Sequence, residues 1–135
     1  MQLQLVPADG PDDIASAFST MAKERAGAFI VLPSPMLFGE HQRIVELAAN
    51  NRLPGIYQAR EFVDAGGLMS YGANLDDLFR HTATYVDKIL KGSKPAELPV
   101  ERPTKFELII NVKTARTMGV TVNRDILLVA DELIE

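Results

Sequence analysis

Residues 28–57 read AFIVLPSPMLFGEHQRIVELAANNRLPGIY, and this stretch decides the fold class. It opens on the apolar run 28–32, which ends at Pro33 and is short enough to favour a buried strand over a helix. A helix with apolar residues at helical spacing follows and ends near Asn51. Residues 53–57 then read as a second buried strand. The stretch therefore predicts a strand–helix–strand unit, which is typical of an α/β protein with a parallel sheet.

The rest of the chain continues this alternation. We expect a strand at 3–6, a helix from Pro11 to about residue 22, a glycine-bounded strand within 66–72, a helix over 75–90, a strand over 106–111, a helix over 113–118 and a last helix over 124–134. Three prolines within 93–104 predict an extended connection. The pattern predicts one domain, 1–135, with a three-layer α/β/α arrangement and a mostly parallel, doubly wound, flavodoxin-like sheet.

Composition narrows the function classes. The chain has 135 residues, 47% hydrophobic and 24% charged, with a formal net charge of −4 and no cysteine. No disulfide or thiolate metal site is therefore possible. The scattered Lys and Arg residues lack the concentrated basic face that nucleic-acid binding needs. No apolar run approaches the length of a membrane span, and residues 1–10 lack the pattern of a signal peptide.

Catalytic and metal-binding patterns are also missing from the sequence. His41 and His81 lie in predicted helices without a second ligand at suitable spacing, so surface roles are expected. There is no Gly-x-Ser-x-Gly elbow, phosphate-binding loop or dinucleotide fingerprint. The pairs Asp12–Asp13 and Asp76–Asp77 each open a predicted helix and are explained by capping. Gly66–Gly67 indicates a tight turn or a close backbone approach. We expect no metal, no cofactor and no enzymatic turnover.

Two loops are the best candidates for a binding site. Ser34 follows the first buried strand, and Arg60–Glu61 follows the second. In open parallel sheets, ligands gather outside the carboxyl ends of the strands, so these loops are expected to lie side by side at one edge. A solvated ion pair is an equally good interpretation of Arg60 and Glu61 from the residues alone.

Two long stretches of the chain resemble one family. They are RIVELAANNRLPGIYQAREFVDAGGLMSYGANLDDLFRHTATYVDKILKGSKPAELPVERPTKFELIINVKTARTMGVTV at 43–122 and ADELIE at 130–135. Together they resemble the C-terminal part, mainly lobe two, of periplasmic ABC-transporter substrate-binding proteins of the type I periplasmic-binding-protein kind, in a subgroup often assigned to amino-acid-like solutes. The most telling pieces are 66–72, 85–92, 106–111 and 113–115.

This resemblance implies a ligand-binding half of a larger protein. Members have two α/β lobes joined by crossing strands and trap a solute between the lobes. A full member also has a signal peptide, a first lobe, and a strand and helix that open lobe two. The resemblance implies that this chain is a fragment: the rest of lobe two, a crossover helix at 75–91 that returns to lobe one, and the Pro-rich connection 93–104. It further implies a periplasmic location and an ABC permease as partner of the full-length protein.

The resemblance also marks candidate ligand-binding residues, because loops after the lobe-two strands face the cleft in this family. These residues are Ser34, Pro35, Gln58, Arg60 and Glu61. Related proteins often place Thr, Asp or Asn in the first loop, whereas here Ser34 stands between two prolines. With fewer polar groups in this loop, the candidate solutes are amino-acid-like, aromatic or carboxylated, and the planar guanidinium of Arg60 suits a carboxylate.

The leading interpretation is the solute-binding component of an ABC importer, without chemical turnover. The alternative is a small flavodoxin-like or receiver-like regulatory or interaction module. A receiver would need an Asp at the end of a strand, and no predicted strand ends on one. A small hydrolase would need a nucleophile–base pair, and none is recognisable.

Assembly follows from the apolar stripe on the helix 75–90. The stripe contains Leu78, Phe79, Thr82, Tyr85, Val86 and Ile89. Without a first lobe to cover it, such a stripe favours association, so we expect a homodimer or higher even oligomer built on this helix. The strand at 3–6 is expected either to pair directly with 29–32 or to leave a gap beside it.

Overall fold

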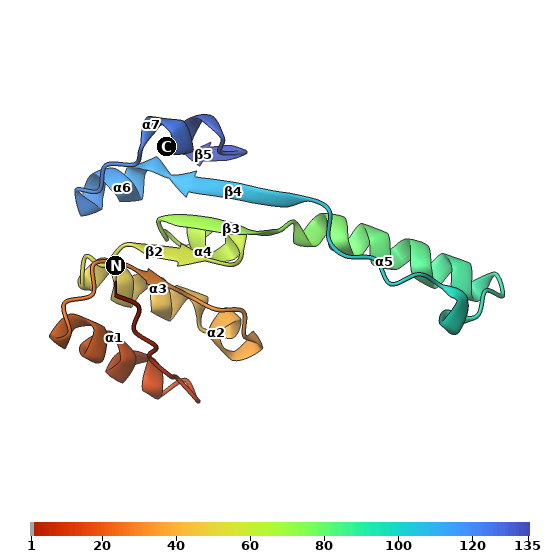
Figure 1. The fold of residues 1–135 in the computed structure, drawn as a ribbon, viewed down its shortest axis with the longest axis horizontal. Helices are drawn as coiled ribbons and strands as arrows, with labels where there is room; N and C mark the ends of the chain where they lie inside the picture. The colour runs from red at the N-terminus through yellow and green to blue at the C-terminus, as the bar shows by residue number, and fades with distance from the viewer. Residues whose placement is uncertain (1) are drawn as a thin grey trace.

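A five-stranded sheet organises the computed structural model, which describes residues 2–135 (Figure 1). The strands lie in the order of the sequence: β1 (Phe29–Ile30), β2 (Gly55–Tyr57), β3 (Met69–Ala73), β4 (Phe106–Asn111) and β5 (Glu132–Ile134). β1, β2 and β3 are parallel, β4 is antiparallel to β3, and β5 is parallel to β4. The predicted α/β class, with a mostly parallel sheet flanked by helices, is confirmed.

The helices connect these strands. They are α1 (Asp13–Lys23), α2 (Pro35–Gly39), α3 (His41–Asn50), α4 (Arg60–Asp64), α5 (Leu75–Leu90), the 3-10 turn η1 (Pro95–Glu97), α6 (Val112–Met118) and α7 (Arg124–Leu128). The side chain of Asn74 caps α5 by accepting a hydrogen bond from Asp77 N, and Gly119 ends α6 with a φ of 71°. Within residues 2–135, none of the helices combines the length and apolarity that crossing a bilayer requires.

Strand register gives the sheet one well-covered face. Its central row consists of Val31, Tyr57, Ser70 and Ile109, each of which is at most 8% exposed. Helices α1, α3 and α4 supply the apolar side chains that pack with this face. The ring of Tyr57 stacks on that of Phe62, with centroids 4.8 Å apart, and burial raises the pKa of the Tyr57 phenol. This core fixes α4 beneath β2 and β3.

The opposite face of the sheet is open beside β1 and β2. Its central row is Ile30, Ile56, Met69, Ile110 and Leu133. Ile110 is fully buried, whereas Ile30 is 64% exposed. α6 and α7 lie near β4 and β5 (Figure 1). On this face, the side chains shielded from solvent are therefore concentrated around β4.

Helix α5 extends away from the sheet, and the connection that follows runs back along it to β4 (Figure 1). Tyr85 Oη donates a hydrogen bond of 2.7 Å to Pro99 O, which fastens the connection to the helix. The apolar stripe of α5 faces solvent: Phe79 is 67% exposed and Val86 is 50% exposed. The predicted helix and its stripe are thus both present.

The N-terminal part of the prediction needs correction. Residues 3–6 form no strand, and no strand among residues 2–135 pairs with them. Leu3 and Leu5 are accordingly 78% and 81% exposed, since an extended segment is held in a sheet only by a hydrogen-bonded neighbour. The first sheet strand is shorter than the apolar run 28–32 and is not buried on both sides, because Ile30 lies on the open face.

Two other predictions are wrong in part. The proposed last helix, 124–134, ends at Leu128, and β5 follows because its backbone groups pair with β4. The Pro-rich connection contains the short turn η1, which starts at Pro95 and so loses no helical hydrogen bond.

Candidate functional site

The carboxyl ends of β1, β2 and β3 meet at one edge of the sheet, because these strands are parallel neighbours. The loops after β1 and β2 lie side by side there, as the sequence predicts. The amide of Gln58, oriented with its nitrogen toward β1, donates hydrogen bonds of 3.0 Å to both Val31 O and Leu32 O. The antiparallel strand β4 begins at the same edge and places Glu107 opposite Gly72.

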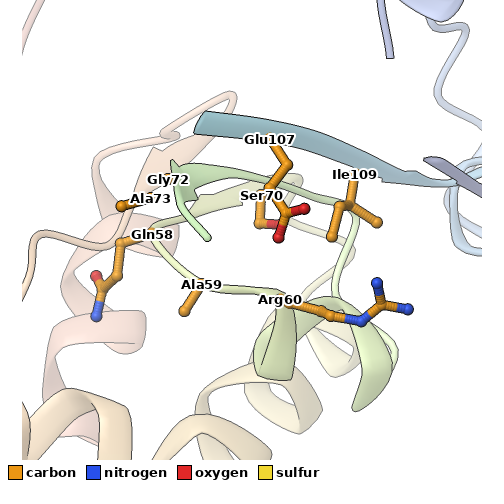
Figure 2. Close-up of a pocket in the computed structure, with 8 residues that line it drawn as sticks. All are labelled: Gln58, Ala59, Arg60, Ser70, Gly72, Ala73, Glu107 and Ile109. Atoms are coloured by element: carbon orange, nitrogen blue, oxygen red, sulfur yellow. The ribbon is translucent and has the colours of Figure 1, made fainter. Parts of the chain in front are cut away.

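Two adjoining hollows open at this edge. The first hollow is lined by Gln58, Ala59, Arg60, Ser70, Gly72, Ala73, Glu107 and Ile109 (Figure 2). The second hollow is lined by Arg60, Glu61, Ala73, Asn74, Leu75, Asp76 and Glu107. Their volumes are ≈ 10 Å³ and ≈ 70 Å³, so the first holds about one water molecule and neither encloses a drug-sized solute.

Close backbone packing shapes the first hollow. A Cβ atom added at Gly72 would lie 1.9 Å from Gln58 O, so only glycine lets β3 approach the loop after β2 so closely. Gln58 contributes to the wall of the hollow, while its side-chain amide is directed away from the hollow (Figure 2) and binds the end of β1. Gln58 is thus a structural link between the two loops.

Arg60 and Glu61 begin helix α4 and do not lie in a loop. The helix forms here because Phe62 and Val63 are both 0% exposed and anchor this turn in the core. The Arg60 side chain binds Asp64 Oδ2 at 3.2 Å and both carboxylate oxygens of Glu132 at 2.6 and 2.9 Å. Arg60 is therefore ion-paired, but with Asp64 and Glu132 and not with Glu61.

This ion pair shifts both partners toward their charged forms. The hydrogen bond from Arg60 lowers the pKa of Glu132, and the same bond raises the pKa of Arg60. Figure 2 shows the guanidinium of Arg60 extending away from the first hollow. Arg60 thus lines both hollows, while its guanidinium is paired with Glu132 of β5.

The polar atoms that face the hollows are mostly acceptors. The carboxylate of Glu107 points into the first hollow (Figure 2), and Asn74 Nδ2 donates a hydrogen bond of 2.7 Å to its Oε2. Glu61 Oε2 is buried and accepts no hydrogen bond from residues 2–135. Asp76 adds a third carboxylate to the lining.

The first predicted loop lies next to this site but not in it. Ser34 caps α2, with its Oγ accepting from Leu37 N at 3.5 Å, and Pro35 is the first residue of that helix. Neither residue lines either hollow. The structure therefore brings Gln58, Arg60 and Glu61 together and leaves Ser34 and Pro35 beyond the end of β1.

Sequence reasoning missed most of the lining. The residues missed are Ser70, Gly72, Ala73, Asn74, Leu75, Asp76, Glu107 and Ile109. The sequence contains a pattern that could have pointed to Gly72, since this residue ends a glycine-bounded strand. No sequence pattern pointed to Glu107, because its place in the site depends on β4 running antiparallel to β3. Among residues 2–135, no cluster of three His, Asp or Glu side chains is arranged to hold a metal ion.

Comparisons with known proteins agree with this geometry. Two solved structures align with TM-scores of 0.85: a conserved domain protein from Vibrio cholerae O1 biovar El Tor strain N16961, at 25% identity, and an ABC domain in complex with L-Trp from Streptococcus pneumoniae, at 27% identity. The alignments cover 93% and 94% of this chain but 42% and 43% of those chains. The chain therefore spans less than half the length of these two proteins.

A third structure shares the fold at lower similarity. It is the ligand-free, open form of CD0873, a substrate binding protein with adhesive properties from Clostridium difficile, with 18% identity, a TM-score of 0.61, and coverage of 91% of this chain and 41% of that chain. No protein of curated function matches the sequence. The sequence model of one family, described as ABC transporter substrate binding protein, matches residues 1–134. Because this match covers nearly the whole chain and the fold agrees with it, the chain belongs to the ABC transporter substrate binding protein family.

Proposed function

We propose that this chain is part of the solute-binding component of an ABC importer and captures a small organic solute without chemical turnover. The observation that carries the proposal is the pair of polar hollows at the carboxyl ends of β2 and β3, in a chain that matches this family over residues 1–134. The L-Trp complex of the Streptococcus pneumoniae structure supports the same role.

The size of the hollows favours binding between two lobes. Volumes of ≈ 10 Å³ and ≈ 70 Å³ are far below the roughly 300–1,000 Å³ of ordinary ligand pockets. A second lobe would close over the solute and exclude water. The chain alone is therefore expected to bind a solute weakly. In the full-length protein, an ABC permease would receive the solute, and the family resemblance supports the periplasm as the compartment.

The binding residues that we propose are Ser34, Pro35, Gln58, Arg60 and Glu61. The last three line the hollows, and the first two follow the adjacent strand. We propose that the solute is an amino-acid-like, aromatic or carboxylated compound. L-Trp, which is bound in the Streptococcus pneumoniae structure, combines all three features.

An NMR titration of ¹⁵N-labelled protein tests this function. Amino acids and aromatic carboxylates are added singly, up to about 10 mM, because weak binding by one lobe corresponds to millimolar affinity. Binding should shift the amide signals of 58–61, 70–76 and 107, and the solute should be recovered unchanged. Shifts confined to another part of the chain, or a chemically altered solute, would contradict the proposal.

We also propose that the isolated chain forms a homodimer through α5. Leu78, Phe79, Val86 and Ile89 are 37–67% exposed along one helix that projects from the sheet (Figure 1). A two-fold partner that offers the same stripe would remove this apolar surface from water.

A further inference from the structure

We propose that the two hollows receive the positively charged, N–H-donating end of the solute, with Glu107 and Glu61 as the accepting residues. This inference rests on the proposed function, because it names the ligand group that the same site selects. It reverses the polarity expected from the sequence, in which Arg60 would hold a carboxylate.

The charge that remains available to a ligand at this site comes from carboxylates. Among residues 2–135, Arg60 is the one cation that lines the hollows, and its guanidinium is already paired with Asp64 and Glu132. Neither of these partners lines a hollow. The lining also contains the carboxylates of Glu61, Asp76 and Glu107. The charge left for a ligand is therefore negative, which favours a cationic group.

Glu107 lines both hollows and is held in a fixed orientation. Its carboxylate points into the first hollow, whereas the guanidinium of Arg60 points away from it (Figure 2). Asn74 fixes Glu107 by donating to Oε2 at 2.7 Å, and Asn74 Oδ1 is itself occupied by Asp77 N at 2.8 Å. Asn74 thus presents the carboxylate of Glu107 in a set position, with Oε1 available as an acceptor.

Glu61 has a buried Oε2 that accepts no hydrogen bond from residues 2–135. A buried carboxylate oxygen without a donor is unfavourable, and native structures rarely retain one without a reason. Phe62 and Val63 hold this turn of α4 in the core, so the backbone of Glu61 cannot withdraw from the hollow. Rotation of the side chain toward a ligand ammonium group would satisfy the carboxylate with charge-assisted hydrogen bonds.

Arg60, which we propose as a binding residue, then contributes to binding by positioning Glu61. Its bidentate bond to Glu132 ties the start of α4 to β5, and α4 presents Glu61 to the second hollow. A ligand carboxylate would have to displace Glu132 from Arg60, whereas a ligand ammonium group would meet unpaired acceptors.

Matched amines and carboxylates on the same scaffold test the inference by NMR titration. The probes are tryptamine against indole-3-propionate, phenethylamine against 3-phenylpropionate, and butylamine against butyrate. We expect the amine to bind at least about tenfold more tightly than its carboxylate partner in at least one pair, because a carboxylate ligand adds like-charge repulsion. Glu61→Gln and Glu107→Gln should each reduce this preference by roughly threefold or more.

Control variants separate binding from folding and from net charge. Asp87→Asn removes one negative charge from α5, away from the hollows, and should leave the preference unchanged. Glu61→Asp keeps the carboxylate and should retain most of the preference for amines. It is the variant to compare with the wild type if Glu61→Gln folds poorly. The inference is overturned if carboxylate probes bind as tightly as amines, or if both glutamine variants keep the full preference. If none of the six probes binds at about 10 mM while an amino acid does, this inference fails and the proposed function stands; if amino acids also fail to bind, the proposed function fails with it.

Discussion

Arg60 and Glu132 lie 72 positions apart in the chain and form a two-pronged ion pair, with Nη1 and Nη2 of Arg60 donating to the two carboxylate oxygens of Glu132 at 2.6 and 2.9 Å. The pair joins the start of α4 to β5, next to the hollows. Both side chains are more than 40% exposed, so solvent screens their attraction. The pair therefore contributes more to the position of α4 relative to β5 than to the free energy of unfolding.

Replacing Glu132 should produce a pH-dependent loss of stability. The pKa of Glu132 is lowered in the folded state, so its stabilisation is present above the unfolded value, about 4.3, and disappears as pH falls through the folded pKa. We expect Glu132→Gln to reduce the free energy of unfolding by about 0.5–1 kcal/mol at pH 7, a figure already discounted for exposure. Urea denaturation at pH 7 and at pH 3 should show the difference shrinking at the lower pH. A constant difference would mean that the charge of Glu132 is not the cause.

Gly72→Ala should disturb both the fold and the site. The new Cβ would lie 1.9 Å from Gln58 O, a backbone atom that cannot move without displacing the end of β2. We expect a loss of about 3 kcal/mol in urea denaturation, at the upper end of typical overpacking costs. Gly39→Ala is the matched control, because nothing lies within 4 Å of its Cβ, and it should cost nothing measurable. Equal stability of the two variants would show that β3 can shift away from Gln58.

Phe62→Ala should be among the most damaging substitutions. Phe62 is 0% exposed and its ring stacks on that of Tyr57. It also packs edge-on against the ring of Phe38, with the two ring centroids 6.3 Å apart. Truncation leaves a cavity and should cost about 3–5 kcal/mol, enough to unfold a marginal domain. Circular dichroism with thermal melting measures the loss. Val100→Ala is the control, because Val100 is 98% exposed, and its melting temperature should stay at the wild-type value.

Charges on the stripe of α5 should abolish self-association. Phe79→Lys with Val86→Lys places two cations where the proposed dimer buries apolar surface. Sedimentation at micromolar concentration should give twice the chain mass of 14.8 kDa for the wild type and a monomer for the double variant. Tyr71→Lys alters the open face of the sheet instead and should remain dimeric. A monomeric wild type, or a dimer broken only by Tyr71→Lys, would contradict the α5 dimer.

The sequence by itself determined the elements whose signals are local. The helix 75–90 and the helix 113–118, which ends at Gly119, are specified by neighbouring residues and appear in the structure with small shifts of boundary. The apolar run 28–32 also gives a strand, although only Phe29–Ile30 belong to β1. The edge at which Gln58, Arg60 and Glu61 gather was also predictable, because parallel strands must point their carboxyl ends the same way.

Only the tertiary structure decided the rest, because the remaining features depend on partners distant in the chain. Residues 3–6 carry a strand-like sequence but find no neighbouring strand among residues 2–135, while 132–134 become a strand because they pair with β4. Glu107 enters the site through its antiparallel register with Gly72, 35 positions earlier. Arg60, which the sequence offers as a carboxylate receptor, is turned toward Glu132 by the packing of β5 beside β4. Backbone pairing and charge pairing are satisfied in three dimensions, so the polarity of the site could not be read from the residues that line it.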